Sequence, residues 1–219
     1  RLERFGSLVM NRPAPGAVEP RRAPDLWAGA ATYLAGSGWW QADGTPLGED
    51  GATLSVSGLT VEVRPSPSGQ VGLFPEHAAG SAWLTTAVGS RVAASREATR
   101  RAEILNLFAS TGLATLLAAA AGAAVVHVDA SRPSVLWARR NADLSGLADR
   151  PIRWIVDDAL AFVLREARRG RRYSGFILDP PSYGHGGRGG RAAWQFDTGI
   201  AGLLEACSVI AEPDAFWLL

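Results

Sequence analysis

Residues 103–131, with the sequence EILNLFASTGLATLLAAAAGAAVVHVDAS, decide the fold. A short apolar run over 104–108 ends in a tight turn over 109–112, and a nearly all-apolar helix is predicted over 113–121. A second apolar run over 125–128 is closed by Asp129. Continuously apolar strands separated by helices indicate a parallel sheet that is covered on both faces.

The alternation of strand and helix continues along the chain. Strands are predicted over 152–156, 173–178 and 215–219, with helices from Ser131, from residues 157–158 and over 197–211. The spacing of apolar residues after Asp158 predicts one buried helix face, formed by Leu160, Val163, Leu164 and Ala167. Because the chain stops inside the fifth strand, we expect a fragment, or a sheet that lacks its C-terminal strands.

Residues 1–70 have a different character, with many prolines and glycines and only short apolar runs. Strands are predicted over 6–10 and 59–63, and Trp27, Trp39 and Trp40 are expected to cover a small β core. The sequence PSPSG at 65–69 predicts a turn into the next domain, which opens with a helix over residues 78–94. The expected organisation is a small β-rich module over 1–70 and an α/β, Rossmann-like domain over 71–219.

The composition argues against several classes of protein. The net charge is +1, so no overall field requires a nucleic-acid partner. Cys207 is the only cysteine, which excludes an internal disulfide and a cysteine-based zinc site and fits a reducing, cytoplasmic setting. No apolar run approaches the length of a membrane span, and neither His77 nor His127 has a partner at ligand spacing, so neither a membrane nor a metal is expected.

One local cluster of charge leaves two interpretations open. A solvated helix end is the favoured one, and contact with phosphates is the other. The cluster consists of Arg165, Arg168, Arg169, Arg171 and Arg172.

Three carboxylates close three successive strands: Asp129, Asp158 and Asp179. Ligands of an open parallel sheet bind beyond the carboxyl ends of its strands, so all three are expected at one crevice. Asp129 follows the first turn by about twenty residues, the spacing of an acid that binds ribose hydroxyls. Each acid alone could equally be a helix or turn cap. Together they favour a nucleoside-containing cofactor.

The turn over 109–112 indicates which kind of cofactor. A dinucleotide site needs three spaced glycines so that a pyrophosphate can approach the backbone, and here Gly112 stands alone. A cofactor without phosphates fits better, and S-adenosylmethionine is such a molecule. An oxidoreductase that uses a dinucleotide is therefore disfavoured.

The sequence Asp179-Pro180-Pro181-Ser182-Tyr183 follows the fourth strand. Two successive prolines stiffen the chain and remove two N–H donors, so carbonyls beside them are expected to be free acceptors. With the Asp179 carboxylate they could hold an amino group or a ring edge, and Tyr183 could stack on a flipped base. A purely structural turn is the alternative, which the position beside the expected cofactor site makes the weaker interpretation.

These segments together resemble the class I S-adenosylmethionine-dependent methyltransferases. More narrowly, they resemble the bacterial family that includes the large-subunit ribosomal RNA methyltransferases making 5-methylcytosine. The resemblance covers residues 70–219 and is carried by NLFASTG at 106–112, HVDAS at 127–131, Asn141, DDA at 157–159 and DPPSY at 179–183. It implies a Rossmann-like sheet, S-adenosylmethionine as the cofactor and a base of RNA, in the first place ribosomal RNA, as the methyl acceptor.

The resemblance also implies roles for individual residues. Asp129 would bind the ribose hydroxyls, Asp158 would lie near the adenine amine, and residues 108–112 would follow the methionine part. Residues 74–76 would pack over the cofactor, and residues 179–183 would face the base. The cofactor-binding residues implied are Phe74, Pro75, Glu76, Asn106, Phe108, Ala109, Ser110, Thr111, Gly112, Asp129, Ala130, Ser131, Asn141, Asp158 and Ala159. The catalytic residues implied are Asp179, Pro180, Pro181 and Tyr183.

The chemistry at the acceptor stays open between two reactions. Methylation of carbon 5 of cytosine needs a nucleophilic cysteine. Cys207 lies in an apolar helix and is expected in the core, and the resemblance places the catalytic cysteine beyond Leu219. Without such a cysteine, the Asp-Pro-Pro motif fits an exocyclic amine or a ring nitrogen, with catalysis by alignment.

Other functions remain as alternatives to RNA methylation. One is methylation of a protein or a small molecule on the same fold. Another is a non-catalytic nucleotide-binding module. A homodimer is also left open.

Overall fold

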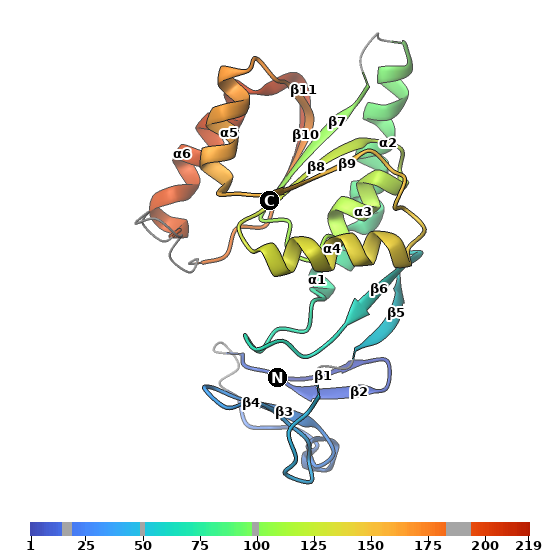
Figure 1. Ribbon diagram of the computed structural model, residues 1–219, viewed down its shortest axis with the longest axis vertical. Helices are drawn as coiled ribbons and strands as arrows, with labels where there is room; N and C mark the ends of the chain where they lie inside the picture. The colour runs from blue at the N-terminus through green and yellow to red at the C-terminus, as the bar shows by residue number, and fades with distance from the viewer. Residues whose placement is uncertain (15–18, 49–50, 98–100, 183–193) are drawn as a thin grey trace. The chain divides into compact units, whose positions relative to one another are not determined.

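The computed structural model describes residues 1–14, 19–48, 51–97, 101–182 and 194–219 (Figure 1). Contacts divide the chain into two compact units, Arg1–Phe74 and Pro75–Leu219. The boundary predicted from the sequence lies a few residues earlier, because the turn over 65–69 still bonds to the first unit. Trp39 Nε1 donates to the Ser66 carbonyl at 2.9 Å, and the Tyr33 hydroxyl donates to the Pro67 carbonyl at 3.0 Å.

The first unit is a small β structure. Its elements are β1 (Leu2–Phe5), β2 (Leu8–Asn11), a 3₁₀ turn η1 (Pro24–Trp27), β3 (Ala31–Leu34), β4 (Gly38–Trp40), β5 (Ala52–Val56) and β6 (Leu59–Val63). Strands β1 to β4 form one sheet in that order, and β5 and β6 form a separate antiparallel pair. The strand predicted over 6–10 was placed too early, because Gly6 has a φ of 62° in the turn between β1 and β2.

Only part of the expected tryptophan core forms in this unit. Trp39 is buried, whereas Trp27 and Trp40 are half-buried. The buried interior of the unit also contains Met10, Val61 and Val63.

The second unit alternates strands and helices. Its elements are α1 (Pro75–Ala79), α2 (Ser81–Glu97), β7 (Glu103–Leu107), α3 (Leu113–Ala120), β8 (Ala124–Asp129), α4 (Arg132–Leu144), β9 (Ile152–Val156), α5 (Ala159–Arg168), β10 (Tyr173–Leu178), α6 (Phe196–Val209) and β11 (Ala211–Leu218). The strands form one parallel sheet in the order β11-β10-β7-β8-β9. The predicted Rossmann-like α/β class is confirmed.

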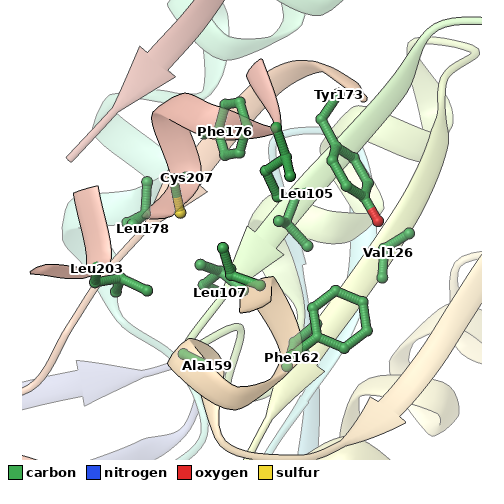
Figure 2. Packing of buried hydrophobic residues seen from close by; sticks show 13 residues of the cluster. Leu105, Leu107, Val126, Ala159, Phe162, Tyr173, Phe176, Leu178, Leu203 and Cys207 are labelled. Carbon is green, nitrogen blue, oxygen red and sulfur yellow. The ribbon is translucent and has the colours of Figure 1, made fainter. Parts of the chain in front are cut away.

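Helices cover both faces of this sheet (Figure 1). Helices α5 and α6 lie on one side, and α2, α3 and α4 lie on the other. Figure 2 shows the core on the α5 and α6 side, where strand residues such as Leu105 and Val126 meet Phe162 of α5 and Cys207 of α6. Helices on both faces explain why β7, β8 and β10 are buried along most of their length.

Two helix starts are fixed by the side chains that the sequence suggests. The Ser131 hydroxyl accepts a hydrogen bond from the Ser134 N–H at 3.3 Å at the start of α4. The Asp158 carboxylate accepts one from the Ala161 N–H at 2.9 Å at the start of α5. Such caps satisfy N–H groups that have no partner inside the helix.

The buried face of α5 is offset by one position from the predicted face. The helix buries Ala159, Phe162, Val163 and Glu166, whereas Leu164 is 45% exposed. Apolar spacing misled the prediction because a charged residue, Glu166, takes one of the buried positions and is hydrogen-bonded there by the Tyr173 hydroxyl at 2.6 Å.

Strand β11 begins earlier than predicted. The prediction began it at 215, whereas the observed strand also contains Glu212, Pro213 and Asp214, which are poor strand formers. The pairing of β10 with β11 shifts register between Tyr173 and Gly175. A proline is tolerated in an edge strand or at such an irregularity.

Candidate active site

The candidate site lies at the carboxyl edge of the parallel sheet. Strands β10, β7, β8 and β9 are neighbours in that order, so the segments that follow them meet along one edge. The connections lead from β7 outward to β8 and β9, and then back to β10 on the other side of β7. This reversal of strand order between β7 and β10 is the point at which open α/β sheets bind ligands. The topology therefore brings the segments after Leu107, Asp129, Val156 and Leu178 to one edge.

The loop between β7 and α3 has an unusual backbone. Phe108, Ser110 and Gly112 have φ values of 54°, 49° and 89°. Positive φ at two non-glycine residues costs free energy and is concentrated at functional sites. Gly112 is also held against α4, since an added Cβ would lie 2.8 Å from the Ala138 Cβ. The Thr111 carbonyl accepts a hydrogen bond from Asn141 Nδ2 at 2.9 Å, which fixes the loop to α4.

A buried polar network supports this loop from below. Asn106 Nδ2 donates to Thr115 Oγ1 at 2.9 Å, and Thr115 Oγ1 lies 2.9 Å from His127 Nδ1. All three side chains are at most 2% exposed. The network connects β7, α3 and β8 directly beneath the residues expected to bind a cofactor. Burial lowers the pKa of His127 to about 3, so this imidazole is neutral at physiological pH.

Asp129 ends β8, and its carboxylate connects the loops that follow β7 and β8. Its Oδ2 accepts a hydrogen bond from the Ser110 N–H at 2.7 Å, and its Oδ1 accepts one from the Ser131 N–H at 2.8 Å. Burial raises the pKa of the Asp129 carboxyl, and the two N–H donors oppose that rise. A carboxylate can accept about four hydrogen bonds, so each oxygen can still accept from another donor. A vicinal diol supplies two such donors, and the residues present therefore fit a ribose.

The other predicted cofactor residues belong to several segments of the chain. Ala130 and Ser131 follow it directly and are exposed at the end of β8. Asp158 caps α5 with Oδ1 and is exposed, and Ala159 is the first residue of that helix and is buried. Pro75 and Glu76 begin α1, while Phe74 is the last residue of the first unit. Contact of these residues with a cofactor stays a prediction.

Asp179 lies on the other side of the strand reversal. Its Oδ2 is 2.8 Å from His77 Nε2 of α1, so the first helix of this unit is tied to the segment that follows β10. The Asp179 side chain is 56% exposed and the His77 side chain 23% exposed. The pair therefore lies at the surface of the edge, and the Asp179 side chain is the more exposed of the two.

The chain was compared with protein-family models, with curated proteins and with solved structures. No family model matches the chain. The solved structure of an S-adenosylmethionine-dependent methyltransferase from Agrobacterium tumefaciens is 38% identical, with a TM-score of 0.83, over 98% of this chain and 66% of that chain. This chain is a class I methyltransferase by fold.

Two further relatives extend the comparison. A Streptococcus mutans protein solved as an S-adenosylmethionine-dependent methyltransferase shares the fold, with 19% identity and a TM-score of 0.67, over 86% of this chain and 46% of that one. The ribosomal RNA large subunit methyltransferase K/L of Methylococcus capsulatus is 39% identical over 94 residues, which is 42% of this chain and 13% of that protein. The chain thus spans less than two thirds of each of these relatives.

One residue that contacts two segments of the candidate site was missed by sequence reasoning. Trp194 Nε1 donates to the Pro181 carbonyl at 2.8 Å, and the Trp194 ring lies 4.9 Å from the Phe108 ring between centroids. Trp194 therefore joins the loop after β7 to the motif after β10. No local signal in the sequence indicates this contact, because a glycine-rich segment separates the tryptophan from the motif.

This contact corrects the expectation of free carbonyls in the Asp-Pro-Pro-Ser-Tyr motif. The Pro181 carbonyl is taken by Trp194, and the Ser182 carbonyl accepts a hydrogen bond from the Phe196 N–H at 2.9 Å. The motif's second half is thus bonded to the start of α6. Tyr183, predicted to stack on the base, lies outside the described residues.

Cys207 has no access to the candidate site. It is fully buried on α6 within the core, and burial raises the pKa of its thiol to about 12. A thiol with so high a pKa does not act as a nucleophile. The prediction that Cys207 is a core residue is confirmed.

The described residues hold no group of three or more His, Cys, Asp and Glu side chains that could bind a metal ion. Among the helices described, none is long and apolar enough to cross a bilayer.

Proposed function

We propose that this chain is an S-adenosylmethionine-dependent methyltransferase domain that methylates a base in RNA. The observation that carries the proposal is the Asp129 carboxylate, held by N–H groups of Ser110 and Ser131 at the reversal of strand order. The 38% identity with a methyltransferase of this type supports the cofactor.

Different residues at the edge bind different parts of the cofactor. Asp129 accepts hydrogen bonds from the ribose hydroxyls, and Asp158 offers its second oxygen to the adenine amine. The loop over 108–112 follows the methionine part, with its shape set by the bond from Asn141 to the Thr111 carbonyl. Asn106 acts through Thr115 and holds the base of the loop, because its side chain is nearly fully buried. Pro75 and Glu76 contact the cofactor from α1.

Asp179 and Pro180 are the proposed contacts of the methyl acceptor. When bound, S-adenosylmethionine supplies a methyl group on a sulfonium, which needs only a nucleophile aligned with the S–C bond. Asp179 accepts a hydrogen bond from the acceptor and orients its lone pair, and His77 holds the Asp179 carboxylate in place. Catalysis by alignment of this kind accounts for large rate enhancements without a covalent step.

The buried thiol excludes Cys207 as the nucleophile that methylation of carbon 5 would need. Methylation of carbon 5 needs a covalent adduct of a cysteine with the base. The Asp179 carboxylate instead suits an amine, because it can accept the amine's N–H.

RNA is proposed as the substrate class because of the Methylococcus relative. That protein is named as a ribosomal RNA methyltransferase, and it is 39% identical to 94 residues of this chain. Ribosomal RNA is accordingly the first substrate to test.

Transfer of a tritiated methyl group tests the proposal. The full chain is incubated with labelled S-adenosylmethionine and with ribosomes, deproteinised ribosomal RNA or ribosomal proteins. Nuclease-sensitive label that disappears with Asp179→Ala but persists with Ser208→Ala, an exposed change on α6, supports the function. Label in the protein fraction alone would contradict the RNA assignment.

A further inference from the structure

Six arginines belong to segments at the amino edge of the sheet, opposite the candidate active site. They come from three separate parts of the sequence, namely the segments that enter β7, β9 and β10. They are Arg101, Arg150, Arg153, Arg168, Arg169 and Arg171, and we call them the amino-edge cluster. All six are exposed.

The amino-edge cluster differs in its members from the basic cluster predicted from the sequence. Arg165 is not a member, because its guanidinium pairs with Asp157 near the start of α5. Arg172 turns toward β11 and donates to the Val209 carbonyl. Arg101, Arg150 and Arg153 join from other segments, so the cluster is a product of the fold and extends beyond one helix end.

Three members of the cluster line one pocket. Arg153, Arg169 and Arg171 surround Glu166, which is 1% exposed, in a pocket of about 340 Å³. Arg169 bonds to Glu166 at 2.9 Å and Arg171 to Glu103 at 2.6 Å, whereas Arg153 is 3.7 Å or more from both carboxylates. The Tyr173 hydroxyl takes the remaining Glu166 oxygen at 2.6 Å. The carboxylates therefore order the guanidinium groups without neutralising all of them.

Arg101, Arg150 and Arg168 have no ion-pair partner among the residues that the structure describes. The six arginines face three carboxylates in the same segments, Glu103, Asp149 and Glu166, which leaves an excess of three positive charges. The whole chain carries a net charge of only +1. The net charge of these segments is thus more positive than that of the whole chain, and the remaining residues together are net negative.

We propose that the amino-edge cluster binds the phosphate backbone of the RNA substrate, at a distance from the methylated base. The inference rests on the proposed RNA substrate. Guanidinium groups bind phosphates through paired N–H donors, and phosphate contacts position an RNA without reading its sequence. Neighbouring strands are about 4.8 Å apart, so the cluster extends along an edge about 14 Å wide from β10 to β9. A row of cations of this width suits successive phosphates of a chain better than one isolated anion.

The test measures RNA binding as a function of salt, without cofactor. Arg150→Gln with Arg168→Gln removes two positive charges and breaks no ion pair. The matched control is Arg139→Gln, an exposed arginine in the middle of α4. Fluorescence anisotropy of a labelled single-stranded ribosomal RNA fragment gives the slope of log K against log salt. The double variant is expected to flatten the slope by about 1.4, since each phosphate contact contributes about 0.7.

Thermal unfolding and S-adenosylhomocysteine binding are measured on the same proteins. Unchanged values there, with a flatter salt slope, support the cluster as an RNA-binding surface. A slope equal to that of the wild type, or an equal change with Arg139→Gln, overturns the inference. Preference for an acidic peptide over RNA, lost in the double variant, would also overturn it. Failure to bind S-adenosylhomocysteine would count against the proposed function, and the salt slope would still decide the cluster's role.

Discussion

His77 Nε2 and Asp179 Oδ2 lie 2.8 Å apart, although the two residues are 102 positions apart in the sequence. The contact ties α1 to the segment after β10 and positions the Asp179 carboxylate at the edge where the methyl acceptor is proposed to bind. An orienting hydrogen bond of this kind affects the rate more than the affinity for cofactor.

Replacement of His77 is therefore expected to slow methyl transfer without weakening cofactor binding. A hydrogen bond to a charged group contributes about 1.5 kcal/mol, so His77→Ala should lower kcat about tenfold. His77→Gln keeps an N–H donor and should recover part of that rate. Single-turnover kinetics measure the effect, with S-adenosylhomocysteine titration as the control. A loss of cofactor affinity as large as the loss of rate would show that the bond has a merely structural role.

Gly112→Ala is expected to destabilise the fold and to distort the cofactor loop. The backbone at Gly112 has a φ of 89°, and an added Cβ would lie 2.8 Å from the Ala138 Cβ. Strain and overpacking together should cost about 2–4 kcal/mol. Gly146→Ala is the matched control, since Gly146 has a φ of 68° with open space around it, and should cost about 1–2 kcal/mol. Equal denaturation midpoints for the two variants would contradict the packing account.

His127 should make the stability depend on pH. Its folded pKa is about 3, below the unfolded value of 6.5, so the unfolded chain binds more protons between these values. The contribution of His127 to the free energy of unfolding is fully present above about pH 6.5. It falls as the pH drops, by about 2 kcal/mol at pH 5. Urea denaturation at pH 5 and pH 7 measures this difference. His127→Gln should remove most of it, whereas the same change at the partly exposed His77 should leave it in place.

Cys207 should be dispensable for catalysis. Its thiol is fully buried, and burial raises the thiol pKa to about 12. Cys207→Ala should keep methyl transfer within about twofold of the wild type and cost about 1 kcal/mol of stability through a small cavity. The native thiol should also resist alkylation. Loss of activity in a Cys207→Ala protein that is still folded would restore this cysteine as a candidate nucleophile.

The parallel sheet could be predicted because most of its strands contain short, mostly apolar runs and because α4 and α5 begin at capping side chains. The runs over 152–156 and 173–178 became β9 and β10 with the bounds expected from the sequence. Buried charge was the main obstacle, because Glu166 takes a core-facing position on α5 that no apolar pattern indicates.

The candidate site was predictable where it follows strand ends and unpredictable where it depends on distant contacts. Asp129 and Asp158 could be selected as candidates from their place after apolar runs, and their role stays a prediction. The partners His77 and Trp194 could not, because each reaches the Asp-Pro-Pro motif only through the folded chain. The same reason explains the error about the Pro181 carbonyl, since the donor that occupies it comes from the segment before α6.

Isothermal titration of the full chain with S-adenosylhomocysteine tests the central claim most directly, with Asp129→Ala beside the wild type. Asp157→Asn, a neighbouring acid that pairs with Arg165, is the control. The account predicts one site in the wild type, an affinity about 100-fold weaker in Asp129→Ala because charged hydrogen bonds to the ribose are lost, and little change in the control. Absence of binding to the wild type, or equal affinity in Asp129→Ala, would contradict it.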